Sequence, residues 1–391
     1  MFIERYIKKE VLYSLRNNPV TCILGPRQSG KTTFVKNIIK DIKKKVTYLD
    51  LELDADRQKM KDPELFLGHR ENECVVIDEV QRIPDIFPQL RGLVDRKRIP
   101  ARFLITGSAD PSLIKFTSES LAGRISYIKL LPFNLIEVPK ENNLIKHWIR
   151  GGFPLSFLAK SDDLSIKWLE SFISTYIERD LRILGLDVQS ALMRRLWKMI
   201  SNYHGQMLEM TSISNSLDIS FQTLRKYIDF LEGAFIINRL YPYYVNIGKR
   251  LIKTPKIFIR DSGILHRLIS INNYDELQTY PKIGQSWEGY VIEQIKQIID
   301  EIFNLSMYYY RTHDGSEIDL VIVKGIKPVS CIEIKYSSAP SLSKGNSIAI
   351  KDLETDNNFI IIPECDEEYP IRKDIMVCNL ETFLEKYLPK M

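Results

Sequence analysis

The stretch Val20-Thr-Cys-Ile-Leu-Gly25-Pro-Arg-Gln-Ser-Gly30-Lys-Thr-Thr33 decides the fold, and it lies near the start of the 391-residue chain. Its first six residues are apolar enough for a buried strand, and helical spacing follows Lys31. Between them stands Gly-x-x-x-x-Gly-Lys-Thr. The two glycines let the backbone curl so that its N–H groups and the start of the helix face phosphate. The stretch therefore predicts a strand, a phosphate-binding loop and a helix.

Three side chains of this loop have expected roles in binding ATP with Mg²⁺. Lys31 should reach the β- and γ-phosphate oxygens, Thr32 should ligate Mg²⁺, and Arg27 is a further candidate for the γ-phosphate. The residues predicted to bind nucleotide are Gly25, Pro26, Arg27, Gln28, Ser29, Gly30, Lys31, Thr32 and Thr33. The alternative is a glycine turn that only joins strand to helix, and such a turn would not require Lys-Thr at this spacing.

A pair of carboxylates follows the apolar run 74–77, at the expected end of a buried strand. Asp78 should hold Mg²⁺ through water, and Glu79 should act as the general base that polarises the attacking water. A polar strand end is the alternative, but the preceding phosphate loop favours a site. The next strand ends in Thr106-Gly-Ser108, where Thr106 is the first candidate for a polar residue that senses nucleotide and Ser108 the second. The alternative is that Thr-Gly-Ser only forms the turn after the strand.

Six motifs then occur in order: GPRQSGKTT, VVIDEVQ, FLITGSA, SLAGR, LPFNLIE and GGFP. Together they resemble the AAA_14 ATPases that carry a DUF4143 C-terminal region, over nearly the whole chain. The resemblance implies an AAA+ domain related to origin-recognition and STAND ATPases, with strand order 5-1-4-3-2. It also implies an arginine that completes the nucleotide site from the same or a neighbouring subunit. Arg124 is the first candidate and Arg179 the alternative.

The middle of the chain is predicted to hold a helical lid at 141–205 and a winged helix at 206–275. Ser220 is the expected N-cap of the second helix of a helix-turn-helix. Residues on its first turns, where DNA contacts would be made, are Gln222, Thr223, Arg225 and Lys226. A basic wing is expected to carry Lys249, Arg250, Lys253 and Lys256. The alternative is that this module packs against the ATPase or senses nucleotide without touching DNA.

Residues 280–391 predict a restriction-endonuclease-like α/β domain. Strand alternation places Glu333 and Lys335 on one face, and Asp319 lies on the preceding strand. Glu288 falls on the apolar stripe of the leading helix, where a carboxylate needs a partner or a metal. The set resembles the D…ExK site of PD-(D/E)XK nucleases, with Glu288, Asp319 and Glu333 as Mg²⁺ ligands and Lys335 orienting water. The alternative is an amphipathic strand whose Glu-Lys pair faces water.

The composition limits the classes of protein further. The chain is 44% hydrophobic and 27% charged and lacks a long apolar run, so we expect no membrane span and a cytoplasmic location. Its five cysteines form no Cys-x-x-Cys pattern, so neither disulfides nor zinc are expected. A net charge of +5 is compatible with nucleic acid but decides nothing.

The combined prediction is an α/β protein with an AAA+ core at 1–140, followed by the lid, the winged helix and the nuclease-like domain. Its function would be Mg²⁺-dependent ATP hydrolysis that controls DNA engagement and a nuclease-like site. The alternative function is a STAND-like molecular switch whose inactive nuclease-like domain binds a protein or nucleic-acid partner. A ring, a dimer and a monomer all fit these motifs.

Overall fold

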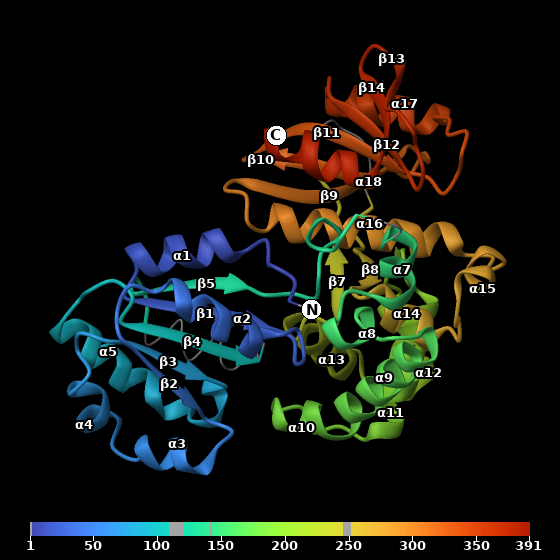
Figure 1. Cartoon of the computed structure of the whole chain (residues 1–391). Helices are drawn as coiled ribbons and strands as arrows, with labels where there is room; N and C mark the ends of the chain where they lie inside the picture. Colours follow the sequence, from blue (N-terminus) through green and yellow to red (C-terminus); the bar gives the residue numbers. More distant parts are fainter. Residues whose placement is uncertain (1, 109–120, 141–142, 245–251) are drawn as a thin grey trace. The chain divides into compact units, whose positions relative to one another are not determined.

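The chain divides into two compact units (Figure 1), as seen in a computed structural model that describes residues 2–108, 121–140, 143–244 and 252–391. Unit 1 contains Met1–Phe133, Arg179–Asp187 and Asp229–Phe235. Unit 2 contains Asn134–Glu178, Val188–Ile228 and Ile236–Met391. Segments far apart in the sequence therefore belong to the same unit.

Unit 1 is built on a five-stranded parallel sheet with the order β2-β3-β4-β1-β5. The strands are β1 (Val20–Gly25), β2 (Val46–Asp50), β3 (Cys74–Asp78), β4 (Phe103–Ser108) and β5 (Ile125–Lys129). Because the strands are parallel, all of their carboxyl ends lie at one edge of the sheet. The observed order confirms the predicted arrangement 5-1-4-3-2.

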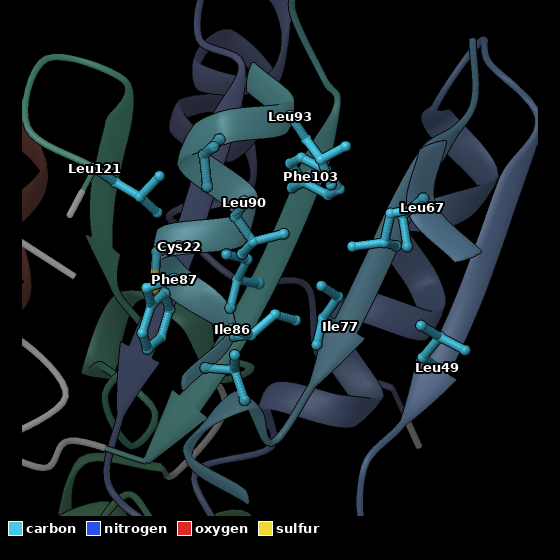
Figure 2. Packing of buried hydrophobic residues seen from close by; sticks show 14 of the residues in the cluster. Cys22, Leu49, Leu67, Ile77, Ile86, Phe87, Leu90, Leu93, Phe103 and Leu121 are labelled. Carbon is cyan, nitrogen blue, oxygen red and sulfur yellow. The ribbon is translucent and has the colours of Figure 1, made fainter. Parts of the chain in front are cut away.

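Helices cover both faces of this sheet, which explains why its central strands are apolar throughout. On one face, Ile23 of β1 packs with residues of α1 (Lys8–Asn17) and α2 (Lys31–Ile38). On the other face, Cys22 belongs to a cluster that also contains residues of α4 (Pro63–Gly68) and α5 (Phe87–Arg96), and Figure 2 shows it beside Phe87 of α5. The short α3 (Asp54–Lys59) follows β2, and α10 (Leu181–Ile183) lies in the segment that returns to unit 1. These two hydrophobic clusters hold the sheet between the helices, and the phosphate loop follows the carboxyl end of its strand β1.

Unit 2 begins with helices, as predicted for the lid region. They are α7 (Asn143–Arg150), α8 (Pro154–Phe157), α9 (Asp162–Thr175) and α11 (Ser190–Asn202). The next helices are α12 (Met210–Leu217), α13 (Phe221–Gly233), α14 (Ser262–Leu268) and α15 (Tyr274–Gln278). The last five residues of α13, from Asp229, belong to unit 1. An antiparallel sheet of order β6-β8-β7 accompanies them, formed by β6 (Gln206–Met207), β7 (Ile237–Leu240) and β8 (Lys256–Ile259). The Ser220 hydroxyl accepts the Thr223 N–H at 3.0 Å, which confirms the predicted N-cap of α13.

The predicted basic wing is corrected at one position. Lys256 begins β8 and is only 4% exposed, with its ammonium paired to carboxylates, so its assignment to a solvent-facing wing is wrong. A strand position next to the buried residues 257–259 explains the difference. Lys253 is exposed as predicted, whereas Lys249 and Arg250 lie outside the described residues.

The C-terminal part of unit 2 is a mixed sheet of order β13-β14-β12-β11-β10-β9, preceded by the long helix α16 (Ile283–Ile299). Its strands are β9 (Leu305–Arg311), β10 (Glu317–Lys324), β11 (Lys327–Ile334), β12 (Asn358–Ile362), β13 (Tyr369–Arg372) and β14 (Ile375–Asn379). The helix α17 (Lys344–Leu353) joins β11 to the parallel strand β12, and α18 (Leu380–Thr382) follows β14. Across the described residues, no helix is both long and apolar enough to cross a bilayer.

Candidate functional site

The phosphate loop connects β1 to α2 and depends on two glycines. A Cβ atom on Gly25 would lie 2.0 Å from the carbonyl oxygen of Leu130, because the loop passes directly beside the end of β5. Gly30 has φ +91°, a left-handed conformation that glycine adopts without steric cost. All of the residues from Gly25 to Thr33 that were predicted to bind nucleotide are thus brought into one turn ahead of, and at the start of, α2.

Inside this loop the groups expected to meet phosphate are buried. Lys31 Nζ donates to the carbonyl oxygens of Gly25 at 3.1 Å and Pro26 at 2.9 Å. Burial lowers the pKa of Lys31, and the negative charges of Glu79 and Asp78 oppose this shift only in part. The Ser29 hydroxyl is buried and has no hydrogen-bond partner among the described residues. A curled backbone, a buried ammonium and an orphaned hydroxyl at a helix start fit a phosphate group.

Asp78, at the end of β3, is 1% exposed and accepts hydrogen bonds on both carboxylate oxygens. Thr106 Oγ1 donates to Oδ1, and the Tyr48 hydroxyl donates to Oδ2 at 2.6 Å. The Thr106 hydroxyl also accepts the Glu79 N–H at 3.1 Å. The structure therefore places the predicted sensor residue against both carboxylate residues. Tyr48 was missed, since nothing local in β2 shows that its ring reaches β3.

Glu79 lies in the left-handed region at φ +59°, which is unusual for a residue with a side chain and marks a backbone held by its surroundings. Its carboxylate accepts from the Gln81 side-chain amide. Gln81 in turn contacts Ser108, whose N–H donates to Gln81 Oε1 at 3.2 Å. The Ser108 hydroxyl also donates directly to Glu79 Oε2 at 3.5 Å, so the second candidate sensor contacts Glu79, whereas Thr106 contacts Asp78. Gln81 is a positioning residue that the sequence did not reveal.

The three candidate arginines form two groups, according to the carboxylate with which each one pairs. Arg27 Nη1 lies 2.5 Å from Asp180 Oδ1, and Arg179 Nε lies 3.1 Å from the same atom. Arg27 and the alternative candidate Arg179 are therefore linked through one buried carboxylate in unit 1. Arg124 instead pairs with both carboxylate oxygens of Asp95, at 2.6 and 3.0 Å.

The position of Arg124 also decides which nucleotide it could reach. Its carbonyl accepts the N–H of Val20, at the start of β1, whereas the phosphate loop follows the end of that strand. A strand rises about 3.3 Å per residue, so the five steps from Val20 to Gly25 separate the two ends by roughly 17 Å. Arg124 therefore lies at the opposite end of the strand from the phosphate loop of its own chain.

A second candidate site is a cleft of about 730 Å³ in unit 2, and it gathers all of the predicted nuclease-like residues. Glu288 comes from α16, Asp319 from β10, and Glu333 from β11. The pairing of β10 with β9 changes register between Ile318 and Val321, at the position of Asp319. Asp319 Oδ2 accepts the N–H of Ile334 at 3.0 Å. The sequence thus predicted correctly that these carboxylates share one region.

Protein donors already occupy the carboxylate of Glu333. Lys335 Nζ lies 2.6 Å from Oε1, which confirms that these two residues are neighbours, and the Asn346 side-chain amide donates to Oε2 at 2.9 Å. Burial, and then the nearby charge of Asp319, raise the pKa of Glu333 to about 8. Burial alone would lower the pKa of Lys335, but Glu333 outweighs it and the pKa is raised. Asn346 was not identified from the sequence.

Lys256 enters the same cleft from β8. Its Nζ lies 2.9 Å from Glu288, 3.1 Å from Glu317 and 3.7 Å from Asp319. Burial would lower the pKa of Lys256, but these carboxylates outweigh it and raise the pKa. Burial also raises the pKa of Glu288 to about 7, with Lys256 opposing the rise.

The side chains in the cleft do not fit a divalent metal ion as they stand. Lys256, Lys335, Asn346 and a backbone amide engage the oxygens that such an ion would need. In the part of the chain that the structure describes, no group of three His, Cys, Asp or Glu side chains is arranged to hold a metal. The predicted metal ligands therefore lie close together, but the ammonium of Lys256 lies among them.

Three family models match successive parts of the chain. An AAA domain model matches residues 17–138, and models for two domains of unknown function, DUF8612 and DUF4143, match residues 141–275 and 283–383. The proteins Rv2008c of Mycobacterium tuberculosis and Mb2031c of Mycobacterium bovis are each 39% identical over 371 residues, covering 95% of this chain and 82% of theirs. The chain belongs to the AAA_14–DUF4143 family.

Among solved structures, the Walker-type ATPase PABY2304 of Pyrococcus abyssi is similar to this AAA_14–DUF4143 protein. The two are 15% identical, the match covers 68% of this chain and 96% of that one, and the TM-score is 0.47. The AAA-type fold and its phosphate loop identify unit 1 as the nucleotide-binding, ATPase part of the family architecture.

The GGFP motif of this AAA_14–DUF4143 chain has a structural explanation within unit 2. Gly151 has φ +74°, and a Cβ atom there would lie 2.2 Å from a carboxylate oxygen of Asp261. Gly152 donates its N–H to that carboxylate at 2.9 Å, and Ile264 does the same at 2.9 Å. Burial raises the pKa of Asp261 to about 6. The two glycines thus allow the backbone to hold a buried carboxylate that caps α14.

Proposed function

We propose that this protein binds Mg²⁺–ATP in the loop from Gly25 to Thr33, hydrolyses it, and uses the nucleotide state to control the modules of unit 2. The observation that carries the proposal is the meeting of Lys31, Asp78 and Glu79 at the carboxyl edge of one parallel sheet. Ligands of open α/β sheets bind at this edge, outside the ends of the strands.

The residues divide the work of hydrolysis. Backbone N–H groups of the loop and Lys31 would bind the β- and γ-phosphates, and Thr32 and Asp78 would hold Mg²⁺, the latter through water. Mg²⁺ would supply charge neutralisation of the phosphates. Glu79 would orient and polarise the attacking water, and Thr106, which contacts Asp78, would report the γ-phosphate to the strand.

An arginine supplied beside the γ-phosphate would complete the site. Arg27 is in the loop itself, and Arg179 shares Asp180 with it. Arg124 could serve only the nucleotide of a neighbouring subunit, and its pair with Asp95 would have to open first.

The test compares Lys31→Ala and Glu79→Gln with a control, Lys40→Ala, which changes an exposed lysine after the same helix. Lys31→Ala should lose binding of a fluorescent ATP analogue. Glu79→Gln should keep binding and lose turnover by roughly 10²-fold or more, because the general base is removed. Unchanged ATP affinity in Lys31→Ala would refute the assignment of the loop.

DNA engagement is a second proposal, and it rests on α12, α13 and the small β-sheet. The order helix, strand, helix, helix, strand, strand from α11 to β8 supports the assignment of a winged helix. Gln222, Arg225 and Lys226 are exposed on the first turns of α13, while Thr223 is half-buried beside Ser220. These positions are the ones that a recognition helix offers to bases and phosphates.

Salt dependence would test this proposal by fluorescence anisotropy with duplex DNA. Lys226→Ala should weaken binding and lower the salt slope by about one, because one phosphate contact is lost. The control Lys373→Ala removes the same charge from an exposed position in the turn between β13 and β14. Equal effects of both variants would show that only net charge matters.

For the cleft of Asp319, Glu333 and Lys335, the side chains favour the alternative function, a module that binds a partner without cutting DNA. Support comes from the protein donors that engage its carboxylates. Incubation of plasmid and single-stranded DNA with Mg²⁺, with and without ATP, should therefore give no cleavage. Cleavage that is lost in Asp319→Ala would restore the nuclease reading.

A further inference from the structure

The ammonium of Lys256 is buried in unit 2 among several carboxylates. Its side chain is 5% exposed, and Nζ is within 4 Å of Glu288, Glu317 and Asp319, which come from α16 and β10. The ring of Tyr309 lies 5.6 Å from Nζ. An ammonium has three N–H donors, so one lysine can serve three carboxylates at once.

The backbone around Lys256 holds this side chain in place. In β8, Lys256 pairs with Met207 of β6 and with Leu240 of β7. The Tyr309 hydroxyl donates to the carbonyl of Thr254 at 2.5 Å, and the N–H of Ile252 donates to the carbonyl of Arg311. The chain leading into β8 is therefore attached to β9, and Lys256 is not a surface side chain that happens to fold inward.

Basic side chains offset part of the acidic charge around the cleft without any added ion. The cleft is lined by five acidic side chains, those of Glu209, Glu288, Glu317, Asp319 and Glu333, and by three basic ones, those of Lys256, Lys335 and Arg311. Arg311 pairs with Glu317 at 3.3 Å. A buried carboxylate cluster requires cations of some kind. In this protein, the cations are side chains.

We propose that Lys256 is a built-in cation, whose ammonium takes the position among three carboxylates that a divalent ion would need and thereby keeps Mg²⁺ out of the cleft. Magnesium binds oxygen at about 2.1 Å, so an ion on the Glu288 oxygen that lies 2.9 Å from Nζ would be within about 5 Å of the ammonium, and the two positive charges would repel each other. A divalent ion can enter only when Lys256 leaves. Because Lys256 belongs to β8, binding of a divalent ion in the cleft depends on the position of this strand.

The inference does not depend on ATP hydrolysis, and its test uses the nucleotide-free full chain. Mn²⁺ binding is measured by water-proton relaxation for wild type, Lys256→Met, Lys256→Gln and the control Lys253→Met, which removes an exposed lysine three residues earlier. Wild type and Lys253→Met should bind the same number of ions. Lys256→Met and Lys256→Gln should gain one ion, with affinity at least about tenfold higher than any wild-type binding in the cleft, because a like charge is removed beside the ligands.

A second substitution assigns the gained ion to the cleft. Lys256→Met combined with Asp319→Asn should lose it. The proposal fails if Asp319→Asn alone removes an ion that wild type binds, since metal would then share the cleft with Lys256. It also fails if both Lys256 variants keep wild-type circular dichroism and gain no ion. Should both variants unfold, the comparison of wild type with Asp319→Asn still decides, and ATP affinity measured in parallel keeps this result separate from the nucleotide site.

Discussion

Replacing Gly25 by alanine should damage the nucleotide site through a single backbone contact. The added Cβ would lie 2.0 Å from the carbonyl oxygen of Leu130 and 3.0 Å from its carbonyl carbon. Leu130 is fully buried and donates its own N–H to Leu24 at 2.7 Å, so it cannot move without disturbing β1. The phosphate loop and β5 must therefore separate.

The size of the effect follows from these distances. Cβ atoms essentially never approach closer than 3.0 Å, so the loop must shift by at least 1.0 Å. We expect a stability cost of about 1–3 kcal/mol for this overpacking. A shift of about 1 Å also takes a 3 Å hydrogen bond to phosphate out of range. Losing one such charge-assisted bond, worth about 2 kcal/mol, should weaken ATP binding about thirtyfold.

The matched control is Gly92→Ala, in the exposed part of α5, where no atom lies within 4 Å of the new Cβ. Alanine should stabilise this helix by about 0.5–1 kcal/mol and leave ATP binding unchanged. Titration with a fluorescent ATP analogue gives the affinity, and amide hydrogen exchange of β1 and β5 reports the local stability. Wild-type affinity and unchanged exchange in Gly25→Ala would refute the reasoning.

Two further predictions concern buried titratable groups of unit 2, and urea unfolding followed by tryptophan emission tests both. Burial lowers the pKa of His204 to about 3. Below pH 6.5 the unfolded chain therefore binds a proton that the folded chain does not. The free energy of unfolding should fall as the pH falls toward 3. Between pH 7 and pH 5, wild type should lose about 2 kcal/mol more than His204→Gln, and equal losses would contradict the assignment. Arg260 and Glu293 form a buried pair with contacts of 2.8 to 3.1 Å. Arg260→Met should cost about 3–5 kcal/mol, and adding Glu293→Leu should recover most of it; a double variant as unstable as the single one would show that the charge left behind is not the cause.

The sequence predicted best those parts of the site that are local in the chain. Lys31 and Asp78 belong to short motifs in which the chemistry and the strand-loop-helix context coincide, and the structure places them at one sheet edge as expected. Asp319, Glu333 and Lys335 were found in the same way, because strand alternation alone shows which residues share a face. The resemblance supplied the strand order.

What the sequence could not show are partners brought in from distant segments. Tyr48 is 30 residues from Asp78, and Lys256 is 32 residues from Glu288. Neither has a local signal, and Lys256 was misplaced because it follows a basic stretch that resembles a wing. The only hint was its position directly before a buried apolar run. The roles of Arg124 and Arg179 stay predictions, since they depend on neighbouring subunits.

The division of the chain into units has a consequence for dissecting the protein. The chain crosses between the two units five times, after residues 133, 178, 187, 228 and 235. A fragment that ends at residue 138, where the AAA domain match stops, keeps the phosphate loop but loses Asp180, which holds Arg27. Unit 1 is therefore not contained in one continuous fragment of the chain. A cut at any single position therefore leaves at least one of the two units incomplete.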